Sequence, residues 1–181
     1  MDMNFENNVR DYQGAVYGSF TGKIVEILPH GANGLNSDCC SMLVTVEAQE
    51  NNITNFVVNP VTYVVDFVTL EVGMECTFWY FLNAPAVLIY PPRYTASVVA
   101  QVQEDRMVEV AYFDDDLVND KKSLKLNLSD EQIIYTTNQQ KFLGSPAGRD
   151  LVVEYDFTTR SIPAQTTPTK VVVLCGMNLY V

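Results

Sequence analysis

Residues 75–102 read ECTFWYFLNAPAVLIYPPRYTASVVAQV, and this stretch decides the fold of the chain. Its two ends, residues 75–82 and 94–102, are crowded with aromatic and β-branched side chains, which favour extended strands. Three prolines stand between them, and proline cannot donate a backbone hydrogen bond inside a sheet. The stretch therefore predicts two strands joined by an apolar loop that its prolines stiffen.

The same alternation of apolar and polar residues extends outward through the chain and predicts an all-β fold. The segment 54–66 is expected to bend at Pro60. In the first half we expect strands at 22–28, 41–48, 54–66, 75–82 and 94–102, and in the second half at 107–113, 123–129, 131–136, 150–157 and 170–175.

The two sets of five strands resemble each other in order and spacing. At an offset of 75 positions, Phe78 falls on Val153 and Val98 on Val173. With the Val72–Gly73 turn before the fourth strand, this order predicts two tandem five-stranded OB-like barrels. The alternative is a single β-sandwich of about ten strands.

The repeat divides the chain into an N-terminal arm and two units. We expect the arm at 1–20, the first OB-like barrel at 21–102, a linker at 103–106 and the second OB-like barrel at 107–181. Because the linker is so short, the two barrels should pack on each other as a fixed pair.

Charge argues against two classes of partner. The chain has 22 acidic and 11 basic residues, a net charge of −11. Nucleic acid is bound chiefly through Lys and Arg at its phosphates, so this balance disfavours it as a partner. No apolar run approaches the roughly 20 residues of a membrane-spanning helix, so we expect no membrane insertion.

Two cellular locations are consistent with the sequence. The N-terminal residues have neither a basic flank nor an apolar segment, so no secretory signal is visible. The chain is cytoplasmic, or exported if a signal has been removed. The four cysteines lack metal-site spacing, and we expect thiols rather than a disulfide framework.

The loop between the fourth and fifth strands is the candidate binding site. In OB-type barrels this loop is one of two that commonly hold a ligand. Leu88, Ile89, Tyr90 and Tyr94 are the predicted partner-binding residues. Alternatively, the loop folds back over its own barrel or the other one, or holds a small ligand. The corresponding loop at 158–168 is polar and offers a weaker apolar contact.

Residues able to do chemistry are sparse. There is no nucleophile elbow, phosphate-binding loop or dinucleotide fingerprint. His30 is the only histidine, and the acidic turn at 114–120 lacks the spacing of a calcium loop. We therefore predict no catalytic residue, no cofactor and no metal site, and favour a protein that is not an enzyme.

Three segments carry a resemblance to a known group of proteins. They are YFLNAPAVLIYPPRYTASVVA (80–100), DLVNDKKSLKLNLSDEQIIY (116–135) and TTRSIPAQTTPTKVVVL (158–174). With them the chain, from about Gly18 to Cys175, resembles uncharacterised tandem β-barrel proteins of Gram-positive, clostridial-type anaerobes. In some relatives this region stands upstream of a copper amine oxidase N-terminal-like domain. The resemblance implies no activity, and the ligands for copper are not evident in this sequence.

The sequence thus predicts a non-enzymatic protein-interaction or assembly module. Its partner is another protein or a second copy of the chain in a homo-oligomer. The alternative is an OB-type module that binds an oligosaccharide or a single-stranded nucleic acid, with bases or sugars stacked on Trp79 and Tyr94.

Overall fold

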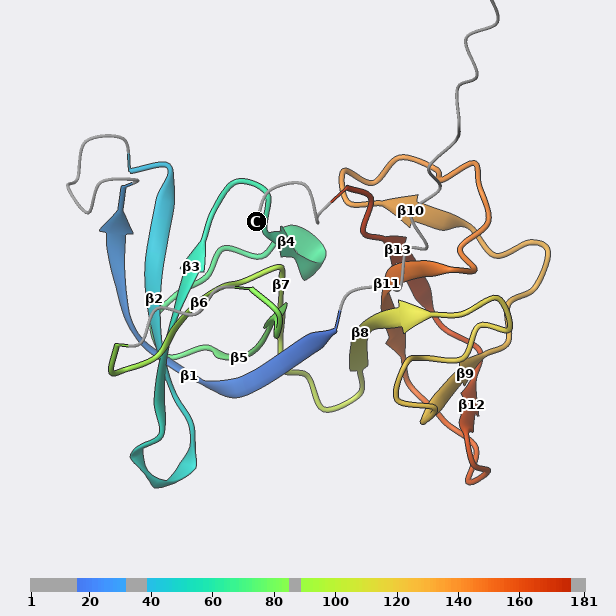
Figure 1. Cartoon of the computed structure of the whole chain (residues 1–181), viewed down its shortest axis with the longest axis horizontal. Helices are drawn as coiled ribbons and strands as arrows, with labels where there is room; N and C mark the ends of the chain where they lie inside the picture. The colour runs from blue at the N-terminus through green and yellow to red at the C-terminus, as the bar shows by residue number, and fades with distance from the viewer. Residues whose placement is uncertain (1–15, 32–38, 85–88, 177–181) are drawn as a thin grey trace, which may run out of the picture.

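The computed structural model describes residues 16–31, 39–84 and 89–176, and it confirms the all-β fold (Figure 1). The strands form a seven-stranded sheet in the first half, and a four-stranded and a two-stranded sheet in the second. In chain order the elements are β1 (Tyr17–His30), β2 (Ser41–Glu47), the 3₁₀ turn η1 (Gln49–Asn51), β3 (Ile53–Val58), β4 (Tyr63–Val64), the 3₁₀ turn η2 (Val65–Phe67), β5 (Glu75–Phe81), β6 (Arg93–Thr95), β7 (Val98–Gln101), β8 (Met107–Phe113), β9 (Leu124–Leu126), β10 (Ile134–Thr136), β11 (Arg149–Tyr155), β12 (Ala164–Thr166) and β13 (Lys170–Val173).

The long strand β1 is bent and pairs with two neighbouring strands. Its first part pairs with β5, and its second part, from Lys23 onward, pairs with β2. At the changeover, a Cβ on Gly22 would lie 2.5 Å from the carbonyl oxygen of Glu47. Only glycine allows the two backbones to approach this closely. Gly22 therefore permits the bend that lets one strand bind both partners.

One continuous segment of chain, 93–101, links opposite sides of the seven-stranded sheet, because β6 is its last strand and β7 is second from the other end. The order is β4-β7-β5-β1-β2-β3-β6, with β6 and β7 separated only by Ala96 and Ser97. The Ala96 amide donates to Val57 on β3 at 2.9 Å, and the Ser97 amide donates to Trp79 on β5 at 2.8 Å. Even so, no sheet in the described part of the chain closes as an unbroken ladder, so closed barrels are not confirmed.

The second half pairs its strands in the same order as the first. β8, β11, β13 and β10 pair in succession, as β1, β5, β7 and β4 do, and the last pair is parallel in each half. β9 and β12 pair in parallel, as β3 and β6 do. Strand β12 was not expected from the sequence, because its Ala-Gln-Thr composition gives no strand signal.

Each half has its own hydrophobic core. Phe78 packs with Phe56 and Val44 in the first half, whereas Val153 packs with Phe113 and Leu126 in the second. Because these cores are distinct, the alternative of a single sandwich with one shared core is wrong.

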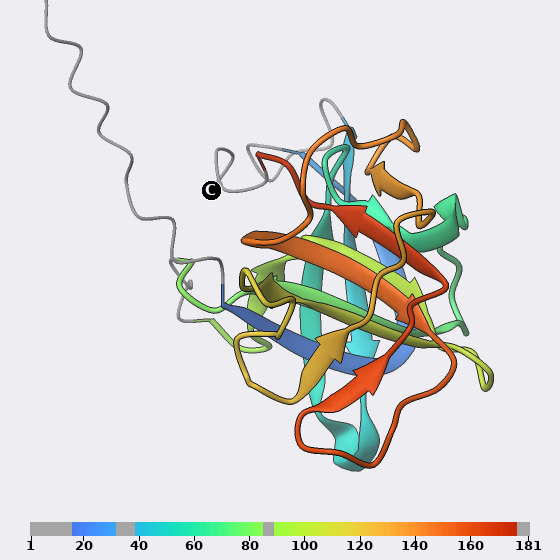
Figure 2. The same cartoon turned by 90° about the vertical axis from the view of Figure 1, so that its right-hand side faces the viewer.

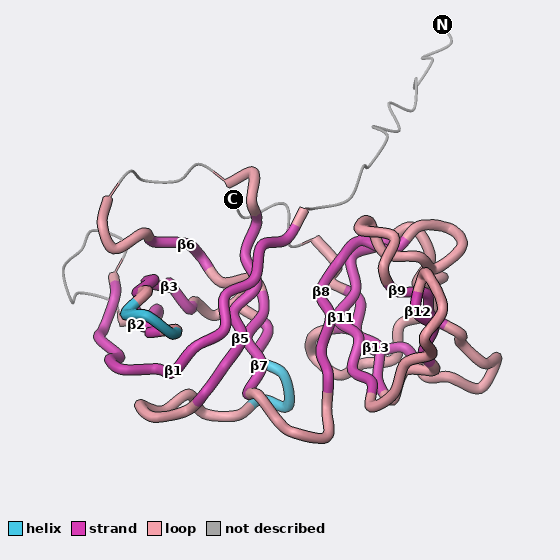
Figure 3. The backbone as a smooth tube through the Cα atoms, turned by 90° about the horizontal axis from the view of Figure 1, so that it is seen from below, coloured by secondary structure: helices cyan, strands magenta, loops and turns pink. Residues whose placement is uncertain are grey.

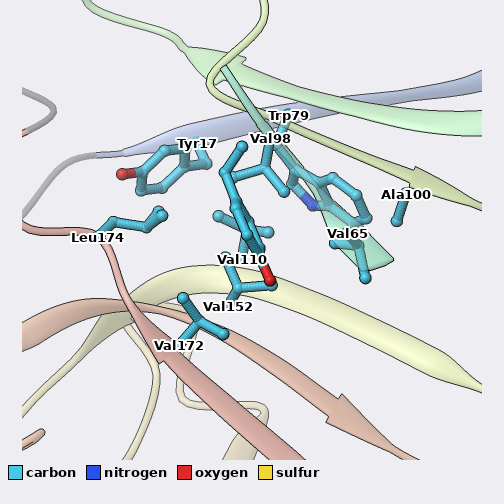
Figure 4. Close-up of a cluster of buried hydrophobic side chains, with 10 residues drawn as sticks. Tyr17, Val65, Trp79, Val98, Ala100, Val110, Val152, Val172 and Leu174 are labelled. Atoms are coloured by element: carbon cyan, nitrogen blue, oxygen red, sulfur yellow. The ribbon is translucent and has the colours of Figure 1, made fainter. Parts of the chain in front are cut away.

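A third apolar cluster joins the halves. We call it the interface cluster: Tyr17, Tyr63, Val65, Trp79, Val98, Ala100, Val110, Val152, Val172 and Leu174. Its side chains come from the outer faces of the facing sheets (Figure 4). Seen from below, β5 and β7 lie on the side of the first half nearest to β8 and β11 (Figure 3). Figure 2, which looks at the second half from its outer end, shows its strands in front of those of the first.

The two facing pairs of strands are equivalent in register. Trp79 lies opposite Val98 on β5 and β7, and Val152 lies opposite Val172 on β11 and β13. All four belong to the interface cluster, so each half contributes the same face. The predicted equivalence of Val98 with Val173 is wrong by one residue, because Val173 points into the core of the second half.

β1 begins at Tyr17, inside the expected arm of residues 1–20. The expected linker 103–106 is a tight turn closed by an antiparallel bridge between Gln103 and Arg106. Most of the expected arm, residues 1–15, lies outside the described residues. A search of the described chain finds no helix long and apolar enough to cross a membrane.

We expect replacement of Trp79 by alanine to uncouple the two halves. Large-to-small changes of a buried aromatic residue cost about 3–5 kcal/mol, and here the loss falls on the interface cluster. Calorimetry should show one transition for the native chain, and two for Trp79→Ala with the first half melting earlier. Phe78→Ala, one residue away in the first core, is the matched control. A single transition in the Trp79 variant, shifted no more than in the control, would contradict the coupling.

Candidate functional site

The loop before β6 presents two apolar side chains to solvent. Tyr90 is 86% exposed and Ile89 is 41% exposed. They are followed by Pro91 and Pro92, and the Pro92 carbonyl accepts a hydrogen bond from the amide of Asn55 at 2.9 Å. The prolines and this bond fix the backbone next to the exposed pair. Leu88, also predicted at this site, lies outside the described residues.

Tyr94, the fourth predicted contact, is partly buried and packs on its own half. Its ring stacks on Tyr80 of β5 with the ring centroids 4.1 Å apart, and it also contacts Phe56. Burial, with a contribution from Tyr94, raises the pKa of Tyr80. Tyr94 therefore supports the loop as part of the edge of the first core, while Ile89 and Tyr90 are exposed.

The equivalent loop of the second half carries an exposed apolar residue that the sequence analysis missed. Ile162 is 97% exposed and directly precedes Pro163, as Tyr90 precedes Pro91. The loop is fixed by its own hydrogen bonds: the Thr159 amide donates to Gln165, and the Ser161 hydroxyl donates to the Pro163 carbonyl. The shared position before proline is the signal that could have identified Ile162.

The two loops are separate surfaces. β6 lies in the first half and β12 in the second, on opposite sides of the boundary between the halves (Figure 1). Phe157, also exposed, belongs to the β12 side. The molecule therefore presents two apolar contact points, each on a backbone held in place, rather than one continuous patch.

A charged cluster locks the two halves beside the interface cluster. We call it the ion cluster: Asp66 of η2, Arg106 of the turn, and Glu154 and Lys170 of the second half. Arg106 pairs with Asp66 and with Glu154, the latter at 3.1 Å, and donates to the Gln101 carbonyl. Lys170 lies 3.4 Å from Asp66 and 3.6 Å from Glu154. Arg106 and Glu154 are mostly buried, and their burial is tolerated because each faces an opposite charge.

The cluster shifts the ionisation of its members. Burial alone would raise the pKa of Asp66, but the hydrogen bond and charge of Arg106, with those of Lys170, hold that pKa below its ordinary value. Burial alone would lower the pKa of Lys170, but the neighbouring Tyr63, Glu154 and Asp66 raise it. Both groups are therefore held in their charged forms.

The structure also places the other residues that the sequence analysis considered for chemistry or binding: Trp79, the cysteines and the acidic turn. Trp79 is 6% exposed, within the interface cluster, and cannot stack on a base or sugar in this structure. All four cysteines are thiols, as expected. In the acidic turn, Asp114 accepts hydrogen bonds from the turn amides and from Lys122 at 2.6 Å. Within the described ranges, no group of three His, Cys, Asp or Glu side chains could hold a metal ion.

Comparison with known proteins adds no identification. No protein-family model matches this chain, and no curated protein matches it. The resemblance to clostridial-type tandem barrels therefore stays a prediction.

We expect Asp66→Asn to remove part of the acid sensitivity of folding. The folded pKa of Asp66 lies below its unfolded value of 3.8, so its stabilising contribution is present above that value and is lost as pH falls through the folded pKa. The native chain should therefore exceed the variant in stability at pH 7, and the difference should shrink below about pH 4. Urea unfolding across this range measures both.

Asp105→Asn, in the exposed turn 103–106, makes the same charge change outside the ion cluster and is the control. A difference between the native chain and Asp66→Asn that stays constant from pH 7 to below pH 4 would contradict the role given to Asp66.

Proposed function

We propose that this protein is a non-enzymatic protein-interaction or assembly module made of two OB-like units in fixed orientation. The observation that carries the proposal is the pair Ile89 and Tyr90, exposed on a backbone that two prolines and a hydrogen bond to β3 hold in place. Tyrosine in such a position is typical of residues that contribute most of the binding energy at an interface.

The fixed backbone next to Ile89 and Tyr90 favours a contact function. Ordering a mobile segment costs free energy on binding, and a segment that is already fixed avoids most of that cost. Tyr90 also combines a large apolar ring with a hydroxyl group that can hydrogen bond at the rim of a contact. A partner pocket of apolar residues with a hydrogen-bonding edge would match it.

The OB-like assignment is supported by strand order and by the chain path. The bent β1, and the segment 93–101 that bonds to β3 on one side and to β5 on the other, are features of a five-stranded OB-type unit. The recurrence of the same pairing order after residue 106 supports a tandem pair.

A fixed pair of units suits an assembly role. The interface cluster and the ion cluster hold the loops before β6 and β12 at a constant separation, so one molecule can contact two partners, or two sites of one partner, in a defined geometry. Simultaneous contacts of this kind raise the overall affinity without a new type of bond.

The alternative function, oligosaccharide or single-stranded nucleic-acid binding through barrel aromatics, is less supported. Trp79 is buried between the halves and Tyr94 is stacked on Tyr80. The net charge of −11 also opposes a phosphate backbone. Trp79 offers no open face for stacking, and one face of the Tyr94 ring is already covered by Tyr80.

The double variant Ile89→Ser and Tyr90→Ser tests the proposal. We expect loss of self-association, measured by sedimentation velocity over a range of concentrations, or loss of one defined crosslinked species when a photoreactive residue is placed at the exposed position 95 of β6 in both the native chain and the variant. Circular dichroism should be unchanged, since the residues are exposed. Leu143→Ser, another exposed apolar position, is the control and should leave assembly intact.

Unchanged hydrodynamic size together with unchanged crosslinking in the double variant would refute the assignment of the contact to this loop. Equal losses in the double variant and in Leu143→Ser would refute it as well, because they would mark non-specific adhesion of exposed apolar residues.

A further inference from the structure

A cleft between the two halves is separate from both loops. Its volume is about 370 Å³, at the lower end of the range for small-molecule sites. The first half contributes the turn after β3 and η2, and the second contributes the turn after β10 and the chain just after β13. The lining residues are Pro60, Val61, Thr62, Tyr63, Phe67, Thr137, Asn138, Cys175 and Gly176.

Among the described residues that line the cleft none is charged, although the chain as a whole carries −11. The negative charge of the protein would repel an anionic ligand, and no cation in the lining would offset that repulsion. A cationic ligand would lose water on entering the cleft without gaining an anionic partner there. The lining therefore favours an uncharged ligand.

Phe67 provides an aromatic face at a conformational cost. Its side chain is 51% exposed, and both it and Asp66 have left-handed backbones, with φ of +52° and +59°. For a residue with a side chain this conformation costs roughly 1–2 kcal/mol. The ion pairs of Asp66 and the edge-on contact between Phe67 and Tyr63, with centroids 5.9 Å apart, hold the turn. Strain that the surrounding structure maintains is a mark of functional sites.

The second half contributes polar residues to the cleft lining. The side-chain oxygen of Asn138 accepts a hydrogen bond from the Thr136 hydroxyl at 2.6 Å. The amide nitrogen of Asn138 therefore remains as a donor, and no partner for it lies among the described residues. Thr137, which carries a hydroxyl group, is also a lining residue. Donors of this kind, fixed opposite an apolar surface, set the orientation of a ligand.

We propose that this cleft binds one uncharged pyranose unit, with the C–H face of the sugar on Phe67 and its hydroxyl groups on Asn138 and Thr137. A pyranose matches the site because it has an apolar face, a hydroxyl edge and no charge. The electron-rich face of an aromatic ring attracts the weakly positive C–H groups of such a face. The site is independent of the loop before β6 and of the proposed assembly function.

Cys175 gives the test a reporter inside the cleft. It is an exposed thiol, as are Cys39 and Cys40, whereas Cys76 is fully buried and burial raises its pKa to about 11. In the full chain with Cys39→Ser and Cys40→Ser, N-ethylmaleimide should therefore label Cys175 alone. The rate of labelling then reports whether the cleft is occupied.

The probes are methyl β-D-glucopyranoside, methyl α-D-mannopyranoside and methyl N-acetyl-β-D-glucosaminide. At least one should slow labelling of Cys175, by about tenfold at a concentration near ten times its dissociation constant. Glucuronate, which carries a charge, should not. Phe67→Ala and Asn138→Leu should each abolish the protection, and Phe157→Ala, an exposed aromatic outside the cleft, should retain it. Phe67→Ala could disturb the folding of η2, whereas Asn138→Leu does not alter η2. Loss of protection in Asn138→Leu therefore cannot be ascribed to a folding defect of η2.

The proposal is overturned if none of the three glycosides slows labelling in the full chain. It is also overturned if the protection survives in Phe67→Ala or in Asn138→Leu, or if glucuronate protects equally. Labelling of Cys175 reports occupancy of the cleft and does not depend on assembly. These outcomes can therefore be told apart from a negative result of the Ile89 and Tyr90 assembly test.

Discussion

The packing of two equivalent sheet faces is the constraint on which the rest of the molecule depends. Trp79 and Val98 from one half meet Val152 and Val172 from the other, and these residues are almost completely buried. Without this contact each half would expose a continuous apolar strip to water, at a cost of roughly 25 cal/mol for each Å². The ion cluster beside this contact, which includes Arg106 and Glu154, fixes the relative orientation of the two halves. Apolar packing alone would fix that orientation less firmly.

Much of the fold follows from the sequence because alternation is a local property. The strand expected at 123–129 contains β9, the segment 54–66 turns at Pro60, and the expected turn at Gly73 is present, with φ +98°. Alternation places Trp79 and Phe78 on opposite sides of β5. For the outer side the aromatic run 78–81 favours burial between the two units over stacking on a base or sugar, and Trp79 does lie in the interface cluster.

The parts that sequence reasoning missed depend on contacts between distant segments. β12 is a strand only because Leu124 to Leu126 lies beside it, and its own residues are neutral in preference. The exposed positions of the candidate site were predicted in part. Ile89 and Tyr90 are exposed, but the ring of Tyr94 stacks on that of Tyr80. The cleft could not be foreseen, because Phe67 and Asn138 come from different halves and meet only after the halves have packed.

The tight turn at 103–106 has a consequence for how such a chain is inherited. Arg106 lies in that turn and binds an acidic residue on each side of it, Asp66 before and Glu154 after. A recombination event that separated the halves would leave each product with a bare apolar strip, and it would separate Asp66 from Lys170, and from Arg106 where that residue stays with the second half. We therefore expect an isolated half to be a poor donor module for other proteins.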